Sequence, residues 1–340
     1  MTPDRLSDLL TEDLARDSLA ELSGSTITGL TRLSGGANNE TWRLNLGDSP
    51  LILRRRPFSA DSVAALEGSI LGLPLADEAA VLTLANETAV PVPRIYRIFD
   101  ATHPIGEAYL MGYIEGESIP QHWLTDERFG SARANLARQC GEALAHIHAI
   151  DCARLPVGIP PTTLAARFAA TQKRLHAFGD VSPVMQLGLN WLIDHAPADT
   201  GNVLLHGDFR TGNLLVDEAG LAGVLDWELT HQGPAGEDLG YLCATVWRFG
   251  QLDKPVGGFG DYEDLLTGYE SVAGWAPDMA TLKYWEVFAA LSWGLVCQTM
   301  GALWHSGQGD VERAAVARRR SEAEIDILLL IDEWESQHHG

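Results

Sequence analysis

Residues 203–228 read VLLHGDFRTGNLLVDEAGLAGVLDWE, and this stretch carries the most informative pattern of the chain. Short apolar runs alternate with glycine-containing polar turns, which predicts two short strands joined as a hairpin. The hairpin would hold Asp208 and Asn213 at one end and return Asp226 to the same end. Their oxygens together suit a divalent cation, and a carboxylate can also accept a hydroxyl proton. An isolated Asp or Asn in a turn more often caps the backbone, so the prediction depends on the whole spacing.

An Asp, an Asn five residues later and an Asp at the next strand end match the protein-kinase catalytic loop and metal-binding Asp in order and spacing. Here residues 206–208 read His-Gly-Asp rather than His-Arg-Asp, and residues 226–228 read Asp-Trp-Glu rather than Asp-Phe-Gly. With these differences, the stretch resembles the aminoglycoside phosphotransferase (APH) family of small-molecule kinases. The resemblance is specific over residues 205–240 and looser over the rest of the chain.

The resemblance implies an α+β, protein-kinase-like fold. A small antiparallel-sheet N-lobe would cover residues 1–115, and a larger, mainly helical C-lobe residues 116–340. It also implies transfer of the ATP γ-phosphoryl group to a hydroxyl of a small molecule. Asp208 would accept the hydroxyl proton, while Asn213 and Asp226 would hold Mg²⁺ near the phosphates. GTP in place of ATP would leave this chemistry unchanged.

The N-terminal part holds the expected phosphate-binding residues. Strands are expected over residues 26–33, 40–46 and 50–56. The loop between the first two consists of small residues: Ser34, Gly35, Gly36, Ala37 and Asn38. Glycines let a backbone approach phosphates and offer N–H groups to them, although a plain hairpin loop also needs Gly and Asn. The position of this loop, one strand before a basic strand, favours the phosphate-binding interpretation.

The third expected strand ends in three arginines, residues 54–56, where kinases place a Lys that contacts phosphates and a Glu of the next helix. The resemblance assigns this role to Arg54, since Arg can bind phosphate in a bidentate manner. Strand alternation alone does not choose among the three, and we expect at least two to form a solvated basic edge. Glu78, near the start of a helix expected over residues 77–88, is the natural partner of Arg54. A Glu favoured by the helix dipole is the alternative.

Strands are also expected over residues 95–99 and 108–114. The second resembles the hinge of the family, where a bulky residue precedes backbone that binds adenine. Met111 would then form the wall of the base pocket. The backbone of Gly112, Tyr113 and Ile114 would hydrogen-bond the base. An ordinary strand end is the alternative.

The chain after the hinge is predicted to be mainly helical, with helices over residues 131–150, 163–178, 182–195, 262–272, 277–305 and 311–337. The resemblance implies that Asp238 ties a helix start to the catalytic loop and that His206 supports this loop. One of His146 and His148 would pack beneath it. Glu228 would contact a metal-bound water or a substrate amine, or pair with a nearby base.

Composition restricts the partners and the compartment. The 340 residues carry a formal net charge of −22, which argues against nucleic acid or an anionic membrane surface as a partner. The four cysteines are scattered, without metal-binding spacing, and the charged N-terminal segment is no signal peptide, so we expect a cytoplasmic protein with free thiols. Residues 285–304 are apolar enough to cross a membrane, but their polar side chains and the lack of flanking basic clusters favour a buried helix.

The acceptor is not specified by the sequence: an aminoglycoside, a hydroxyacyl-CoA and another metabolite alcohol all agree with the resemblance. Residues 247–250 and 285–304 favour a bacterial group of relatives acting on metabolite alcohols. The alternative function is a pseudokinase-like module that binds nucleotide or metabolite without turnover, because the third strand lacks a Lys. The presence of Asp208, Asn213 and Asp226 argues against this alternative, since binding alone requires no base.

Overall fold

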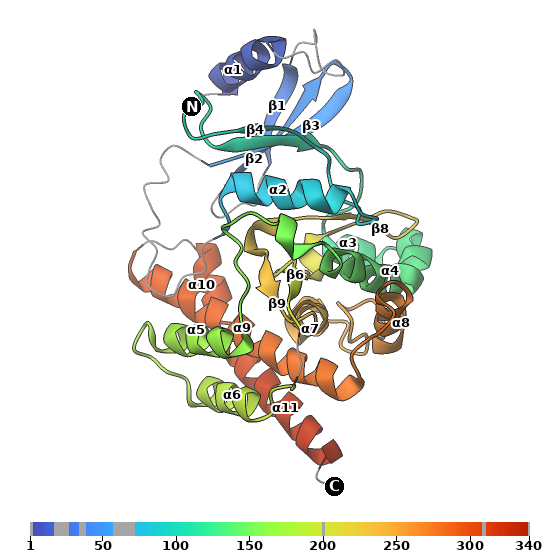
Figure 1. Cartoon of the computed structure of the whole chain (residues 1–340), viewed down its shortest axis with the longest axis vertical. Coiled ribbons are helices and arrows are strands. Elements are labelled where there is room, and N and C mark those ends of the chain that lie inside the picture. The colour runs from blue at the N-terminus through green and yellow to red at the C-terminus, as the bar shows by residue number, and fades with distance from the viewer. Residues whose placement is uncertain are drawn as a thin grey trace.

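The computed structural model describes residues 3–16, 27–33, 39–56, 72–198, 201–307 and 311–338. A five-stranded antiparallel sheet lies at one end of the molecule, and helices form most of the remainder (Figure 1). The α+β class predicted from the sequence, with a small antiparallel sheet and a mainly helical remainder, is therefore confirmed.

The sheet has the strand order β1-β2-β3-β5-β4. Its strands are β1 (Ile27–Leu33), β2 (Glu40–Leu46), β3 (Ser49–Arg55), β4 (Ile95–Phe99) and β5 (Ala108–Gly112). The expected strands are all present, although β5 ends at Gly112 rather than at residue 114. Because β3 lies between β2 and β5, its arginines belong to a central strand and not to an edge.

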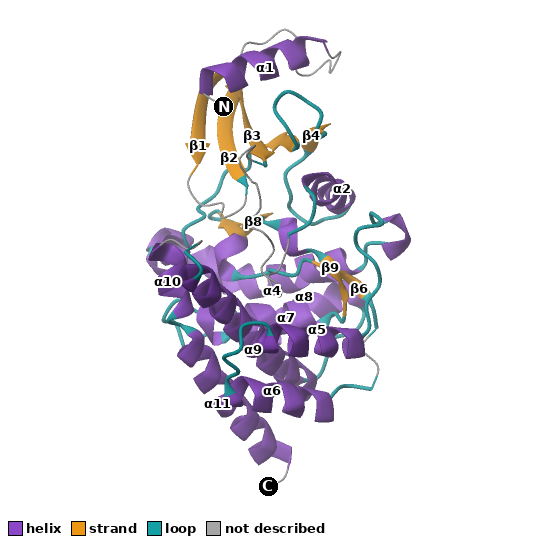
Figure 2. Ribbon diagram, turned by 90° about the vertical axis from the view of Figure 1, so that its left-hand side faces the viewer, coloured by secondary structure: helices purple, strands orange, loops and turns teal. Residues whose placement is uncertain are grey.

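Helices cover the two faces of this sheet. On one face lies α1 (Pro3–Arg16), whose Leu6 and Leu10 are buried with Leu44 and Leu53 of the sheet (Figure 2). On the other lies α2 (Leu75–Asn86), which packs near Tyr109 in the main core. Side chains of residues directly opposite each other on paired strands point to the same face of the sheet. Arg54 is the cross-strand partner of Tyr109, so both side chains point to the face that α2 covers.

The remaining helices build the larger part of the molecule. They are α3 (Pro120–Thr125), α4 (Gly130–His148), α5 (Leu164–His176), α6 (Pro183–Asp194), α7 (Gly236–Cys243), α8 (Tyr262–Ala273), α9 (Met279–His305), α10 (Val311–Ala317) and α11 (Arg320–His338). The prediction of one helix over residues 311–337 is wrong, because the chain turns between α10 and α11. There Arg319 lies over the Trp293 ring at 5.5 Å and Arg320 pairs with Asp180 at 2.7 Å, contacts that pull the turn towards α9 and residue 180.

Helix α9 runs through the centre of the helical part and packs against α7 and α11. Among the described residues it is the one helix long and apolar enough to cross a membrane, and 67% of its most apolar window is buried within the protein. Its Trp285 and Leu291 lie in a core cluster shared with α6 and α11. The buried helix predicted here is therefore confirmed.

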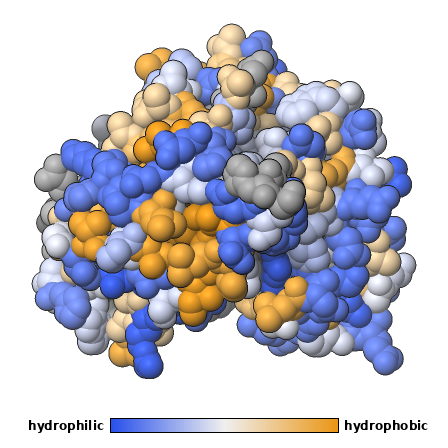
Figure 3. All heavy atoms as spheres, turned by 90° about the horizontal axis from the view of Figure 1, so that it is seen from below, coloured by the Kyte–Doolittle hydropathy of each residue, from blue (hydrophilic) through white to orange (hydrophobic). Residues whose placement is uncertain are grey.

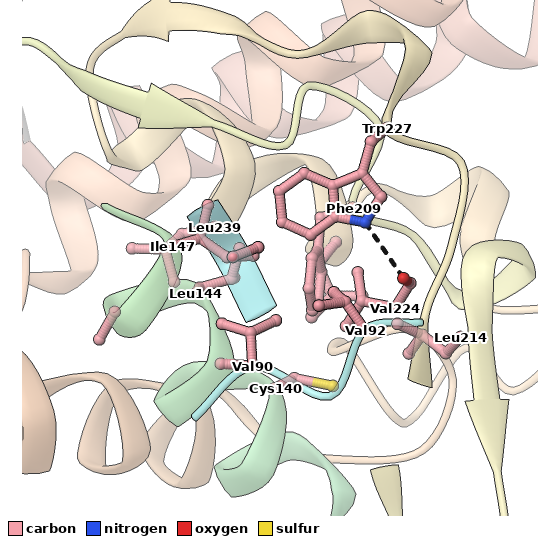
Figure 4. Packing of buried hydrophobic residues seen from close by; sticks show 14 of the residues in the cluster. Val90, Val92, Cys140, Leu144, Ile147, Phe209, Leu214, Val224, Trp227 and Leu239 are labelled. Atoms are coloured by element: carbon pink, nitrogen blue, oxygen red, sulfur yellow. Dashed lines mark hydrogen bonds between the residues drawn. The ribbon is translucent and has the colours of Figure 1, made fainter. Parts of the chain in front are cut away.

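The main core lies directly beneath the 203–228 stretch. Phe209, Leu214 and Trp227 of this stretch are buried in the same core cluster as Leu144 of α4, and the Trp227 Nε1 donates to the Val224 carbonyl at 3.1 Å (Figure 4). Burying these side chains removes a large apolar area from water, which fixes the polar loop above them.

The end of the molecule opposite the five-stranded sheet carries a patch of apolar side chains, seen from below in Figure 3. Helices α6 and α11 lie at this end (Figure 1), and they carry the exposed side chains Leu187, Ile325, Leu328 and Leu329. None of these residues belongs to the site described next.

Candidate active site

Two short ladders position the catalytic-loop residues. Strand β6 (Val203–Leu205) pairs with β9 (His231–Gly233), and β7 (Leu214–Val216) pairs with β8 (Leu221–Val224). The loop over residues 206–213 closes on itself, because the Asn213 Nδ2 donates to the carbonyl and the Oδ2 of Asp208 at 2.9 and 2.7 Å. The Leu225 N–H donates to the Asn213 carbonyl at 2.8 Å, which brings the neighbouring Asp226 to the same end. The predicted convergence of the three residues is confirmed.

Asp238 braces the loop from below, as predicted. Its Oδ2 accepts from the His206 N–H at 2.7 Å, and its Oδ1 accepts from the Gly207 N–H at 2.9 Å. The His148 Nε2 lies 3.3 Å from the same carboxylate, so His148 is the histidine that packs beneath the loop. Burial alone would raise the pKa of Asp238, but these donors and the His148 ring hold it below its ordinary value.

His206 also holds the loop in place. Its ring is fully buried, which lowers the pKa of His206 and favours the neutral form. Its Nε2 lies 3.1 Å from the Leu225 carbonyl, and its Nδ1 accepts from the Asp208 N–H at 3.2 Å. Both ring nitrogens are therefore used in holding the two segments that carry Asp208 and Asp226.

Asp208 contacts side chains that were not predicted from the sequence. The Arg210 Nε lies 3.1 Å from both carboxylate oxygens, and the Arg210 guanidinium lies over the Trp247 ring at 4.7 Å. Burial and the charge of Asp208 raise the pKa of Tyr241 well above its ordinary value. Burial raises the pKa of Asp208, and the charge of Arg210 opposes that rise. Arg210 lies two residues after Asp208 in the motif, which is the signal that could have identified it.

Arg54 reaches the site from the sheet and contacts three carboxylates. Its Nη2 lies 2.8 Å from Asp226 Oδ1 and 2.7 Å from Glu228 Oε2, and its Nε lies 3.5 Å from Glu78 Oε2. The predicted Arg54–Glu78 pair is confirmed. Glu228 also pairs with Arg54, which agrees with one of the two roles expected for it, pairing with a nearby base. Burial alone would lower the pKa of Arg54, but the surrounding carboxylates raise it above its ordinary value.

The neighbouring arginines correct one expectation. Arg55 is buried on the opposite face of β3, where its Nε lies 3.5 Å from Glu40. Arg56 pairs with Glu107 at 2.9 Å and is 42% exposed. The prediction that at least two of the three form a solvated edge is wrong, because β3 is a central strand and its alternation buries Arg55.

Glu78 is the most deeply buried carboxylate of the Arg54 cluster, with an exposed fraction of 1%. The Tyr109 hydroxyl donates to its Oε1 at 3.0 Å. Burial raises the pKa of Glu78 to about 7, although Arg54 favours the charged form. The ion pair with Arg54 is therefore sensitive to pH near neutrality.

The donors near Asp226 fit a hard cation. Because the Asn213 Nδ2 is used in bonds to Asp208, its Oδ1 is the amide atom left to coordinate. Asp226 supplies a carboxylate and has left-handed backbone at φ 66°, a conformation that Asp tolerates better than most residues. Within the described ranges no group of three His, Cys, Asp or Glu side chains is suited to a metal. Mg²⁺ bound here would therefore need further oxygens from phosphates and water.

The expected nucleotide-binding segments are placed in part. Residues 34–38, which form the glycine-containing loop, lie outside the described residues. Met111 is half-buried in β5, and the Gly112 N–H donates to the Arg94 carbonyl at 2.9 Å. Because that bond already uses the Gly112 N–H, the expected contacts with a base would come from the backbone of Tyr113 and Ile114, which follows the end of β5.

The model of the phosphotransferase enzyme family, APH, matches residues 29–275. The chain belongs to this family. Curated relatives include acyl-CoA dehydrogenase family member 10 of Mus musculus, 27% identical over 257 residues, and member 11 of Gallus gallus, 28% identical over 282 residues. The matches cover 72% and 76% of this chain but only 23% and 34% of those proteins. The chain thus spans about a third of their length or less.

Solved structures share the fold of this phosphotransferase. A candidate aminoglycoside phosphotransferase from Ralstonia eutropha JMP134 is 20% identical, with a TM-score of 0.75 and coverage of 96% of this chain and 98% of its own. A mutant of aminoglycoside phosphotransferase APH(4)-Ia, solved with ADP and hygromycin B, is 16% identical, with a TM-score of 0.61 and coverage of 94% and 98%. Aminoglycoside 2'-phosphotransferase-IIIa, solved with GDP, is 13% identical, with a TM-score of 0.62 and coverage of 99% and 100%. These likenesses confirm the predicted protein-kinase-like fold.

Proposed function

We propose that this phosphotransferase moves the γ-phosphoryl group of ATP to a hydroxyl group of a small molecule. The observation that carries the proposal is the meeting of Asp208, Asn213 and Asp226 from the 203–228 stretch with Arg54 from the sheet. A base, a cation site and a phosphate-binding guanidinium are the parts that phosphoryl transfer requires.

In the proposed reaction the acceptor oxygen attacks the γ-phosphorus while the bond from that phosphorus to the bridging oxygen of ADP breaks. Asp208 accepts the proton of the hydroxyl, so the products are ADP and a phosphate monoester. Asn213 and Asp226 would hold Mg²⁺, which would neutralise charge on the phosphates. The raised pKa of Asp208 suits it to accept a proton.

Nucleotide binding is proposed between the sheet and the helical part, over the boundary that we place between residues 115 and 116. Arg54 and the loop over residues 34–38 would bind phosphates, Glu78 would hold Arg54, and Met111 with the following backbone would bind the base. The related structures with ADP and with GDP support a nucleotide without choosing between ATP and GTP. We propose a cytoplasmic location, where the nucleotide is abundant.

Replacing Asp208 by Asn tests the proposal, because Asn keeps the size of the side chain and can still accept from Asn213. We expect Mg²⁺-dependent ATP binding to persist while release of ADP, with water or a panel of alcohols as acceptor, falls at least about 100-fold. The assay compares Kd for ATP with the rate of ADP release. Turnover at the wild-type rate in Asp208→Asn would contradict the mechanism. Binding without turnover in the wild type would favour the non-catalytic module.

A further inference from the structure

Arg210 gives Asp208 a contact that lies outside the hairpin's own bonding. The Arg210 Nε lies 3.1 Å from each of the two carboxylate oxygens, so its N–H is shared between them. The Asn213 Nδ2 binds the same carboxylate from the other end of the loop, 2.7 Å from Oδ2. Burial alone would lower the pKa of Arg210, but the charge of Asp208 raises it above its ordinary value, so the guanidinium stays charged.

Two features hold the guanidinium of Arg210 in this place. Its Cζ lies 4.7 Å from the centre of the Trp247 ring, a cation–π contact. Its Nη1 occupies space that is left by the missing side chain of Gly212, where a Cβ would lie 2.2 Å away. The guanidinium is therefore restricted by an aromatic face and by a glycine as well as by Asp208.

The Trp247 ring is itself fixed in the helical part of the molecule. It closes the short 3-10 turn over Thr245–Trp247 and is 7% exposed. Its ring packs at 5.1 Å against Trp293 of α9 and at 5.5 Å against Tyr241 of α7. Arg210 thus connects the catalytic loop to a buried aromatic cluster supplied by two helices.

We propose that Arg210 is a positioning residue, which fixes the direction in which the Asp208 carboxylate faces the acceptor hydroxyl. A bond from Asn213 to one oxygen leaves the carboxylate free to turn about its Cβ–Cγ bond, a torsion with broad preferences. A donor shared between both oxygens removes that freedom, and Trp247 with Gly212 fixes the donor. A base accelerates proton transfer only when its lone pair is aimed at the proton. That the fixed carboxylate serves an acceptor hydroxyl rests on the proposed function.

Two variants remove the positioning contact in different ways. Arg210→Ala deletes the guanidinium, whereas Gly212→Ala keeps it but displaces it, because among the described residues the added methyl group would meet Arg210. In both we expect kcat for ADP release, with water or a panel of alcohols as acceptor, to fall about 10- to 100-fold, the cost of a misplaced catalytic group. Kd for Mg²⁺ with the non-hydrolysable analogue AMP-PNP should change less than about twofold, which separates positioning from phosphate binding.

Chemical rescue gives a readout that a merely structural role would not move. Ethylguanidinium can occupy the space beside Trp247 in Arg210→Ala, so it should restore part of kcat as its concentration rises. Ethylammonium carries the same charge without a planar group, so it should restore less. Gly212→Ala still contains the arginine side chain, and we expect no rescue there.

A second Asp–Arg pair in the chain provides the matched control. Arg128 also follows an aspartate by two residues, lies 3.5 Å from Asp126 and lies over the Phe129 ring at 4.7 Å, the same ring distance as in the Arg210 contact. Arg128→Ala should keep the wild-type kcat. Gly130→Ala is the control for the added methyl group, since its Cβ would lie 3.8 Å from the Arg133 Nη2, an ordinary contact.

Three results would overturn the proposal: a wild-type kcat in Arg210→Ala, a rise in Kd that accounts for the whole loss, or no rescue by ethylguanidinium in a variant that still binds AMP-PNP. If the wild type turns over with no acceptor, the proposed function fails, and NMR tests the placement of Arg210 separately. Its Nε–H, assigned by its loss in Arg210→Ala, should exchange slowly with water in wild type and faster in Gly212→Ala. Equally fast exchange in both would contradict the placement.

Discussion

A single arginine joins the two parts of the site at the scale of individual residues. Arg54 contacts Asp226, Glu228 and Glu78 at once, so its guanidinium balances three carboxylates that would otherwise repel one another. In the proposed reaction, phosphates and a cation would share these groups with Arg54. The site is thus held by the same charges that it would use for binding.

The sequence could not identify this arginine by itself. Alternation separates Arg54 from Arg55, but it does not say which of the two faces the site. The answer comes from the register with β5, where Arg54 lies opposite Tyr109 and Arg55 opposite Ala108. Register is a property of strand pairing, and only the resemblance to kinases allowed Arg54 to be named.

Glu78 predicts a pH dependence of stability. Since burial raises its pKa to about 7, the folded chain keeps this proton at pH values where the unfolded chain has lost it. The contribution of Glu78 to the free energy of unfolding is therefore fully present below its unfolded pKa and is lost as pH rises through about 7. The side chain of residue 78 cannot titrate in Glu78→Gln. The free energy of unfolding of this variant minus that of wild type should therefore rise by about 1–3 kcal/mol between pH 5 and pH 8.

Urea unfolding of both proteins at the two pH values measures this difference. Glu142, exposed on α4, provides the control, and Glu142→Gln should show no comparable change. If the Glu78→Gln difference is the same at both pH values, the buried carboxyl does not titrate as described.

At the scale of elements, the catalytic loop depends on a close approach of two segments. Gly207 has φ +81°, and a Cβ at this position would lie 2.2 Å from the Leu229 carbonyl oxygen. The loop therefore has no room for a side chain between His206 and Asp208. Much of this arrangement could be predicted, because Asp208, Asn213 and Asp226 belong to one short hairpin. The contact of Arg210 with Trp247 could not, because it depends on packing between segments that are distant in the sequence.

Gly207→Ala should lower the free energy of unfolding by about 2–4 kcal/mol, the sum of backbone strain and overpacking. It should also reduce turnover by displacing Asp208. Gly274→Ala is the matched control: Gly274 ends α8 with φ +75°, and its Cβ would meet nothing within 4 Å. The control should lose only the strain cost of about 1–2 kcal/mol. Equal losses in the two variants, measured by chemical unfolding, would show that the contact with Leu229 is unimportant.

At the scale of the whole molecule, the sheet and the helical part contribute different components to one site. Arg54 and Glu78 come with the sheet and α2, whereas Asp208 and Asp226 come from the stretch above the main core. This division agrees with the family to which the chain belongs. The order of the motifs allowed the fold to be predicted from sequence. The break between α10 and α11 was not predicted; at this turn Arg319 contacts Trp293 and Arg320 contacts Asp180, which are distant in the sequence.

The proposed nucleotide site depends on Mg²⁺ held by Asp226. Thermal unfolding with ATP or GTP, each with and without Mg²⁺, tests it on wild type, Asp226→Asn and Asp217→Asn. Asn suits the left-handed backbone at position 226, and Asp217, in the turn at the other end of the hairpin, is a matched control.

A ligand that binds only the folded chain raises the melting temperature, by a few degrees when its concentration is about 100 times Kd. We predict Mg²⁺-dependent stabilisation by at least one nucleotide in wild type and Asp217→Asn, and its loss in Asp226→Asn. Stabilisation that is independent of Mg²⁺, or unchanged in Asp226→Asn, would show that Asp226 holds no Mg²⁺ for nucleotide binding.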